Sequence, residues 1–169
     1  NIAEITSFIN DNLYSLRSGK FLTGIFASYD KKTKNFEFIN AGHSDCIIFD
    51  NNEVKEDPSN KIPPIGVQPS NLDFNNNLNK ISLKDKVIYI YSDGLSESKD
   101  FEGNDIEASG IIDLINKYKN QPLETQLENI FIEISAFSAL QNITNDEKSI
   151  IKDDITILAI DGKKWIISI

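Results

Sequence analysis

Carboxylates placed next to apolar runs are the residues of this sequence best suited to chemistry. Asp93-Gly94 directly follows the β-branched and aromatic run Val87–Tyr91, and Asp153-Asp154 directly precedes an apolar run at residues 155–160. A carboxylate at a strand end is held rigidly, and glycine permits a turn that exposes it, as a metal ligand requires. Carboxylates without clustered Cys or His favour Mg²⁺, Mn²⁺ or Ca²⁺. Each motif taken alone is more often an ordinary polar turn, so spacing leaves both interpretations open.

The single histidine offers a weaker candidate. His43 lies in the segment Asn40-Ala41-Gly42-His43, directly after a predicted strand, and Cys46 follows three residues later. Strand alternation would point side chains 43 and 46 to opposite faces, which disfavours a Cys–His nucleophilic pair. Cys46 stands beside two isoleucines and is more simply a small core residue. The sequence contains no nucleotide-binding glycine loop, Gly-x-Ser-x-Gly elbow or Cys/His zinc spacing.

The first half of the chain reads as a helix followed by hairpins. Ile5, Phe8, Ile9, Leu13 and Leu16 form one apolar face of a helix over residues 4–16. Two hairpins follow, the first from runs 21–29 and 35–40 and the second from runs 46–49 and 53–55. Residues 57–79, rich in Pro and Asn, read as a long surface loop.

The second half combines strands with two helices. Residues 80–83 lead through a polar turn into Val87–Tyr91 as a strand pair. Apolar periodicity predicts one helix between Ile106 and Tyr118 and another between Leu123 and Phe137, and strands at 155–160 and 165–169 flank an Asp161-Gly162 turn. Strands joined mostly as hairpins predict an α+β fold with antiparallel sheet.

Composition bounds the class of protein. A chain of 169 residues suits a single domain that buries roughly 70% of its extended surface. The net charge of −9, with scattered basic residues, argues against nucleic acid or anionic lipid as partners. No apolar stretch approaches the roughly 20 residues of a spanning helix, and the lone Cys46 fits a reducing compartment, so we expect a cytoplasmic setting without membrane contact. The absence of Met is compatible with a piece of a longer chain.

Four motifs in order carry a family resemblance: Phe21-Leu22-Thr23-Gly24, Asn40-Ala41-Gly42-His43, Tyr91-Ser92-Asp93-Gly94-Leu95-Ser96-Glu97 and Asp153-Asp154-Ile155-Thr156. Together the sequence resembles the metal-dependent serine/threonine phosphatases of the type-2C (PPM) superfamily, in the branch named after stage II sporulation protein E. The resemblance implies a β-sandwich of two mainly antiparallel sheets flanked by helices. It also implies two Mn²⁺ or Mg²⁺ ions that activate water for attack on phosphoserine or phosphothreonine.

The resemblance assigns roles residue by residue. Asp93 and Asp153 become metal ligands, while Gly94 and Asp154 lie near the site. Neighbouring strand residues point to opposite faces, so at most one of Asp153 and Asp154 should face the metal. Asn40, Gly42 and His43 mark a tight turn, with its hydrogen bonds as their main role and substrate contact as a second option.

The sequence also departs from the family pattern. A Gly-Asp strand and an Asp-x-x-Gly-x-Gly turn, which carry the family's other ligands, are not in this sequence. We therefore expect residues 1–169 to be one partial domain that lacks its N-terminal strands and is inactive alone. Open sheet edges would then favour self-association.

The resulting functional prediction is the C-terminal part of a protein serine/threonine phosphatase domain. By analogy with the branch, its substrate is a phosphorylated regulatory protein, of the anti-anti-sigma type in many cases. The alternative from another class is a non-catalytic phosphatase-like module that binds a regulatory partner. A third reading is a plain α+β domain that binds Ca²⁺ or no metal.

Overall fold

The computed structural model describes residues 1–69, 73–100, 102–144, 154–163 and 166–168, with backbone only for 137–144 and 166–168. These residues form two compact units, each assembled from separate stretches of chain. Unit 1 comprises Asn1–Asp45 and Pro58–Lys84, and unit 2 comprises Cys46–Asp57 and Asp85–Ile169. The prediction of a single domain over residues 1–169 stays a prediction.

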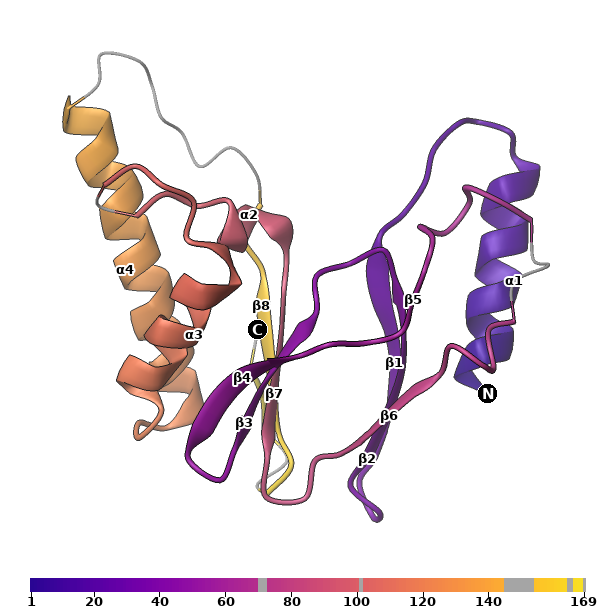
Figure 1. Ribbon diagram of the computed structural model, residues 1–169, viewed down its shortest axis with the longest axis horizontal. Helices are drawn as coiled ribbons and strands as arrows, with labels where there is room; N and C mark the ends of the chain where they lie inside the picture. Colours follow the sequence, from indigo (N-terminus) through magenta and orange to yellow (C-terminus); the bar gives the residue numbers. More distant parts are fainter. Residues whose placement is uncertain (70–72, 101, 145–153, 164–165, 169) are drawn as a thin grey trace. The chain divides into compact units, whose positions relative to one another are not determined.

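Unit 1 contains one helix and a small sheet (Figure 1). Its elements are α1 (Ile2–Ser15), β1 (Gly24–Asp30), β2 (Asn35–Ala41), β5 (Lys61–Ile62) and β6 (Asn79–Ser82). β2 pairs antiparallel with β1 along its whole length, antiparallel with β6 through residues 35–38, and parallel with β5 through residues 40–41. β2 is therefore the organising strand of this unit.

Helix α1 packs on this sheet with a different face from the one that its apolar periodicity predicts. Asn1 and Glu4 form a capping box that starts the helix. Ile9 and Leu13 do contact the core of unit 1, but Ile5, Phe8 and Leu16 are 54%, 70% and 70% exposed. Burial falls instead on three small or polar side chains, Ala3, Thr6 and Asn10.

The polar residues of this buried face have hydrogen-bond partners. The Thr6 hydroxyl donates to the Ile2 carbonyl at 2.8 Å. Asn10 donates through Nδ2 to the Gln68 carbonyl at 3.0 Å and accepts from the Gly66 N–H at 2.9 Å. Burial of a polar group costs little when its hydrogen bonds are made, so local partners override the apolar pattern here.

Unit 2 is a five-stranded antiparallel sheet with helices (Figure 1). The strand order is β4-β3-β7-β8-β9, with β3 Cys46–Asp50, β4 Glu53–Asp57, β7 Val87–Tyr91, β8 Ile157–Asp161 and β9 Ile166–Ser168. The helices are α2 (Asp93–Ser96), α3 (Glu107–Tyr118) and α4 (Leu123–Thr144), and α3 packs against both α4 and β4. The two predicted helices, the strands at 87–91 and 155–160 and the hairpin of residues 46–55 are confirmed with bounds that shift by a few residues, and α2 was not predicted. Trp165 and Ile169 lie outside the described residues.

The core of unit 2 joins the sheet to α3 and α4 and contains one polar network. The Tyr89 hydroxyl donates to Gln126 Oε1 at 2.8 Å, and Gln126 Nε2 donates to the Ile115 carbonyl at 3.3 Å. Burial raises the pKa of the Tyr89 phenol, which keeps it protonated as a donor. Its apolar neighbours in the core include Ile47, Leu95, Ile111, Ile130, Ile134, Ile157 and Ala159.

Two predictions about connections are wrong. The segment 57–79 is not a plain surface loop, because it contains β5 and buries Ile62, Ile65 and Phe74 in the core of unit 1. The run at residues 80–83 does not pair with β7, because β6 adds to β2 while β7 lies between β3 and β8. β7 is apolar on both faces and suits the middle of a sheet, whereas β6 alternates in burial, as does a strand with one face toward solvent. Within the described residues, no helix is both long and apolar enough to span a membrane.

Candidate functional site

Asp93 and Asp154 lie at the same end of the unit 2 sheet, where β7 ends and β8 begins. β7 and β8 pair from Val87–Asp161 to Tyr91–Ile157. The pairing extends beyond the strands: the Ser92 N–H donates to the Thr156 carbonyl at 3.0 Å, and the Thr156 N–H donates to Ser92 Oγ at 2.9 Å. Ser92 Oγ in turn donates to the Asp154 carbonyl at 3.0 Å. Asp93 and Asp154 therefore lie at the same end of these two paired strands.

Asp93 occupies the first position of the short helix α2, where the sequence indicated a turn at Asp-Gly. Its carboxylate is exposed and accepts one hydrogen bond, from the adjacent Gly94 N–H at 3.1 Å. Its carbonyl accepts from Glu97 N–H at 2.8 Å and from the Ser96 hydroxyl at 3.1 Å, which fixes the backbone of the turn. Gly94 is buried. The backbone is thus held while the carboxylate faces solvent.

Carboxylate ligands at this end of the sheet suit a hard cation, but the described ones are too few to complete its coordination. Carboxylate oxygens are the ligands that Mg²⁺ and Mn²⁺ prefer, and such ions take about six of them. Over the described ranges, no group of three or more His, Cys, Asp or Glu is placed to hold one ion. Asp153 lies outside the described residues. The ligand pair Asp93 and Asp153 stays a prediction, and Asp154 is exposed at the same edge.

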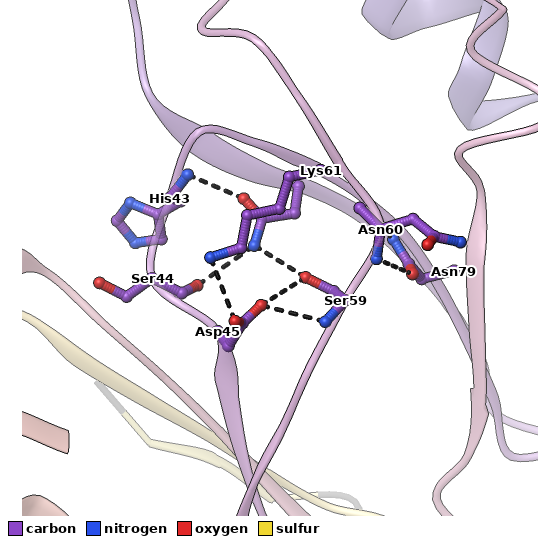
Figure 2. Close-up of polar contacts among 8 residues, drawn as sticks. His43, Ser44, Asp45, Ser59, Asn60, Lys61 and Asn79 are labelled. Atoms are coloured by element: carbon purple, nitrogen blue, oxygen red, sulfur yellow. Dashed lines mark hydrogen bonds and ion pairs between the residues drawn. The ribbon is translucent and has the colours of Figure 1, made fainter.

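The turn after β2 in unit 1 contains the second group of candidate residues (Figure 2). Asn40 is fully buried and makes three hydrogen bonds. Its Oδ1 accepts from the His43 N–H at 2.8 Å, and its Nδ2 donates to Ser59 Oγ at 3.0 Å and to the Ser44 carbonyl at 3.3 Å. Asn40 therefore closes the turn of residues 40–44 onto itself and ties it to Ser59.

Gly42 sits at the tip of that turn with φ +65°, in the left-handed region. A Cβ there would lie 2.9 Å from Pro64 Cγ, so both conformation and space favour glycine. The His43 side chain is partly exposed. Substrate contact by Asn40, Gly42 or His43 stays a prediction.

The network continues to Asp45, Ser59 and Lys61, which sequence reasoning missed. Asp45 Oδ1 accepts from the Ser59 hydroxyl at 2.7 Å and the Ser59 N–H at 3.1 Å, and its Oδ2 pairs with Lys61 Nζ at 3.1 Å. Burial raises the pKa of this carboxyl, but hydrogen bonds from Ser59 and the Lys61 ammonium outweigh it and lower the pKa below its ordinary value. The partners lie 14 and 16 positions away with no shared periodicity, so only Pro58 before Ser59 signals a turn in the sequence.

A family comparison identifies this combination of elements. The model of the stage II sporulation protein E (SpoIIE) family matches residues 1–163. The chain belongs to the SpoIIE family. This family consists of phosphatase domains of the PP2C type, which are metal-dependent, and the predicted resemblance is confirmed. No curated protein sequence matched the chain.

Three solved structures support the fold of this SpoIIE family member. The RsbU and RsbW domains of a Mycobacterium tuberculosis protein align with a TM-score of 0.59 at 20% identity, over 88% of this chain and 38% of that one. The phosphatase domain of SpoIIE from Bacillus subtilis gives 0.58 at 16%, over 94% and 64%, and the SiaA PP2C domain of Pseudomonas aeruginosa gives 0.55 at 21%, over 77% and 47%. The chain spans less than two thirds of each of these solved chains. The predicted α+β class, with two mainly antiparallel sheets and helices, is confirmed.

Proposed function

We propose that this chain is part of a protein serine/threonine phosphatase domain and contributes Asp93 and Asp153 to a two-ion Mn²⁺ or Mg²⁺ centre. The observation that carries the proposal is the exposed Asp93 carboxylate, on a fixed backbone, at the edge where the chain also enters β8. Membership of the SpoIIE family supports the reaction class. The substrate in this proposal is phosphoserine or phosphothreonine on a cytoplasmic regulatory protein, of the anti-anti-sigma type.

The chemistry divides between the ions and the chain. When bound, the metal ions lower the pKa of a coordinated water and neutralise charge on the phosphoryl group. The chain positions the carboxylates: Ser92 links the end of β7 to the segment that enters β8, so Asp93 and Asp154 keep a fixed relation. These carboxylates are fewer than a hard cation needs, so the chain alone should bind metal weakly and turn over no substrate.

The test is Mn²⁺ binding and hydrolysis of p-nitrophenyl phosphate by the complete domain, with Asp93→Asn and Asp153→Asn variants. Asp113→Asn, which changes an exposed carboxylate on α3, is the matched control. We expect both site variants to fold, to bind Mn²⁺ at least about tenfold more weakly in calorimetry, and to lose metal-dependent turnover, while the control keeps both. Wild-type Mn²⁺ affinity in either site variant would exclude that residue as a ligand.

The alternative is a non-catalytic module that holds a regulatory partner. One observation favours it: the described part of the chain brings together too few ligands for one ion. A phosphoprotein retained by the complete domain without turnover in millimolar Mn²⁺ would support the module, and turnover would exclude it. Self-association is tested on the same protein by light scattering, as a mass above that of one chain. We expect it because β1 has β2 as its only strand partner among the described residues, which leaves an open sheet edge.

A further inference from the structure

A surface cavity of about 310 Å³ in unit 1 carries a concentration of positive charge. It lies between the last turn of α1, the loop Arg17-Ser18-Gly19-Lys20 and the turn at Gly66-Val67. Arg17 is the only arginine in a sequence with 26 acidic residues and a net charge of −9. No carboxylate lines the cavity among the described residues. Two positive side chains without a carboxylate beside them would bind an anion favourably.

The two cations are available to a ligand. Over the described part of the chain, neither the Arg17 nor the Lys20 side chain forms an ion pair. Both side chains are exposed. Ser18 and Tyr14 line the same cavity, and each carries a hydroxyl group that can donate a hydrogen bond. A guanidinium offers a planar fork that matches phosphate oxygens, and an ammonium adds a second charge.

The wall of the cavity at Gly66-Val67 is held by hydrogen bonds and close packing. Asn10 is 1% exposed and holds the turn through the Gly66 N–H and the Gln68 carbonyl. Leu22 and Ile65 exchange two backbone hydrogen bonds of 3.0 and 2.8 Å. Gly66, at φ +89°, packs so closely that a Cβ would lie 2.7 Å from Leu13 Cγ and 3.1 Å from the Lys20 carbonyl oxygen. The cavity is thus formed before any ligand arrives, which lowers the cost of binding.

Apolar side chains line the cavity or flank its cationic loop in the sequence. Val67 lines the cavity and is 52% exposed, and Leu16 and Phe21, adjacent in sequence to the cationic loop, are exposed as well. A free inorganic anion would leave this surface unused. A phosphate attached to an apolar neighbour would contact both parts.

We propose that this cavity binds the phosphate group of a phosphate monoester through Arg17 and Lys20. Two positive charges match the charge of −1.5 to −2 that a phosphate monoester carries at neutral pH. Two sources of the group fit the chemistry, a phosphoserine peptide with apolar flanking residues and a small phosphate metabolite. The proposal does not depend on the phosphatase reaction, because it uses neither Asp93 nor a metal.

The test is an NMR titration of the ¹⁵N-labelled protein in EDTA, which removes metal-dependent binding. The probes are inorganic phosphate, phenyl phosphate and a Leu-phosphoserine-Leu peptide with its unphosphorylated counterpart. We expect shifts at Ser18, Gly19, Lys20 and Gly66, with the flanked phosphates binding more tightly than inorganic phosphate. Tighter binding of the phosphopeptide than of phenyl phosphate would identify a peptide source, and the reverse order a small metabolite.

Arg17→Gln and Lys20→Gln separate the proposed contacts from general charge. Each should weaken phosphate binding by about tenfold, because each removes a charge-assisted hydrogen bond. Lys84→Gln is the matched control, since it removes an exposed positive charge of unit 1 outside the cavity and should change affinity by less than about twofold. Wild-type affinity in Arg17→Gln, equal losses in all three variants, or shifts that map elsewhere would overturn the proposal.

Discussion

The turn at Asn40 and the edge at Asp93 are both polar segments that follow a strand, yet they differ in how the protein treats the polar atoms. Asn40 is fully buried, and its amide makes three hydrogen bonds inside unit 1. Asp93 is exposed, and its carboxylate accepts one hydrogen bond from the adjacent Gly94. Polar atoms satisfied within the protein support the fold, whereas an exposed carboxylate on a fixed backbone is free to serve a ligand. The two motifs should therefore respond oppositely to substitution.

Asn40→Ala should produce the largest loss of stability. It leaves the His43 N–H without its acceptor and removes both donors to Ser44 and Ser59, which should cost about 3 kcal/mol of unfolding free energy. Asp93→Asn should change that free energy by less than about 0.5 kcal/mol. Urea denaturation of both variants measures the difference. Equal stability losses would remove the distinction between the two motifs.

Gly42→Ala should cost about 2 kcal/mol, because a Cβ at φ +65° is strained and would press on Pro64. Gly24→Ala is its control. A Cβ at Gly24, the first residue of β1, meets its nearest atom, Phe26 Cε2, at 4.0 Å, so this variant should be neutral or slightly stabilising. Thermal unfolding would check both, and an unaffected Gly42→Ala protein would mean that the turn does not need its conformation.

Two tyrosines extend the same comparison to hydroxyl groups. Tyr89→Phe leaves the buried Gln126 Oε1 without its donor and should cost about 1.5 kcal/mol. The buried Tyr29 hydroxyl has no hydrogen-bond partner among the described residues, so Tyr29→Phe should be neutral or stabilising. Urea midpoints of the two variants give the comparison. A destabilised Tyr29→Phe protein would show that this hydroxyl has a partner in solution.

Asp45→Asn should have a small destabilising effect, under about 1 kcal/mol, and one that depends on pH. The folded pKa of Asp45 lies below the unfolded value of about 3.9, so its carboxylate stabilises the fold above that pH, and the contribution is lost as pH falls through the folded pKa. The variant should be less stable than wild type at pH 7 and converge with it in acid. Unfolding free energies from pH 7 to pH 2.5 would test this, and a constant difference would exclude the ionised carboxylate as the cause.

Local patterns were sufficient to predict most elements of this fold. The hairpins and helices follow from periodicity and turn residues that lie within a few positions of one another, and the Asp93 edge follows from a strand that ends in Asp-Gly. The buried face of α1 could not be read this way. It depends on Asn10 bonding to Gly66 and Gln68, more than 50 residues away, and no local signal encodes that partnership.

The prediction that residues 80–83 pair with β7 failed for a related reason. Residues 80–83 and β7 are adjacent in sequence and both read as strands, but adjacency does not specify the sheet that each joins. Asp45 likewise gains its partners only when the segment that leads into β5 brings Ser59 and Lys61 to it. Sequence reasoning placed the residues whose positions follow from local patterns and missed those whose contacts depend on distant partners.

The interleaved course of the chain has a consequence for how the protein folds during synthesis. The β3–β4 hairpin belongs to unit 2, yet residues 58–84 of unit 1 separate it from β7, and β8 follows only at residue 157. During synthesis, β3 can therefore pair with β4 at once, but its other edge stays unpaired until β7 has been made. Such long-range pairing slows folding and prolongs exposure of an apolar strand. Because each unit consists of two separate stretches of chain, no single proteolytic cut could release either unit whole.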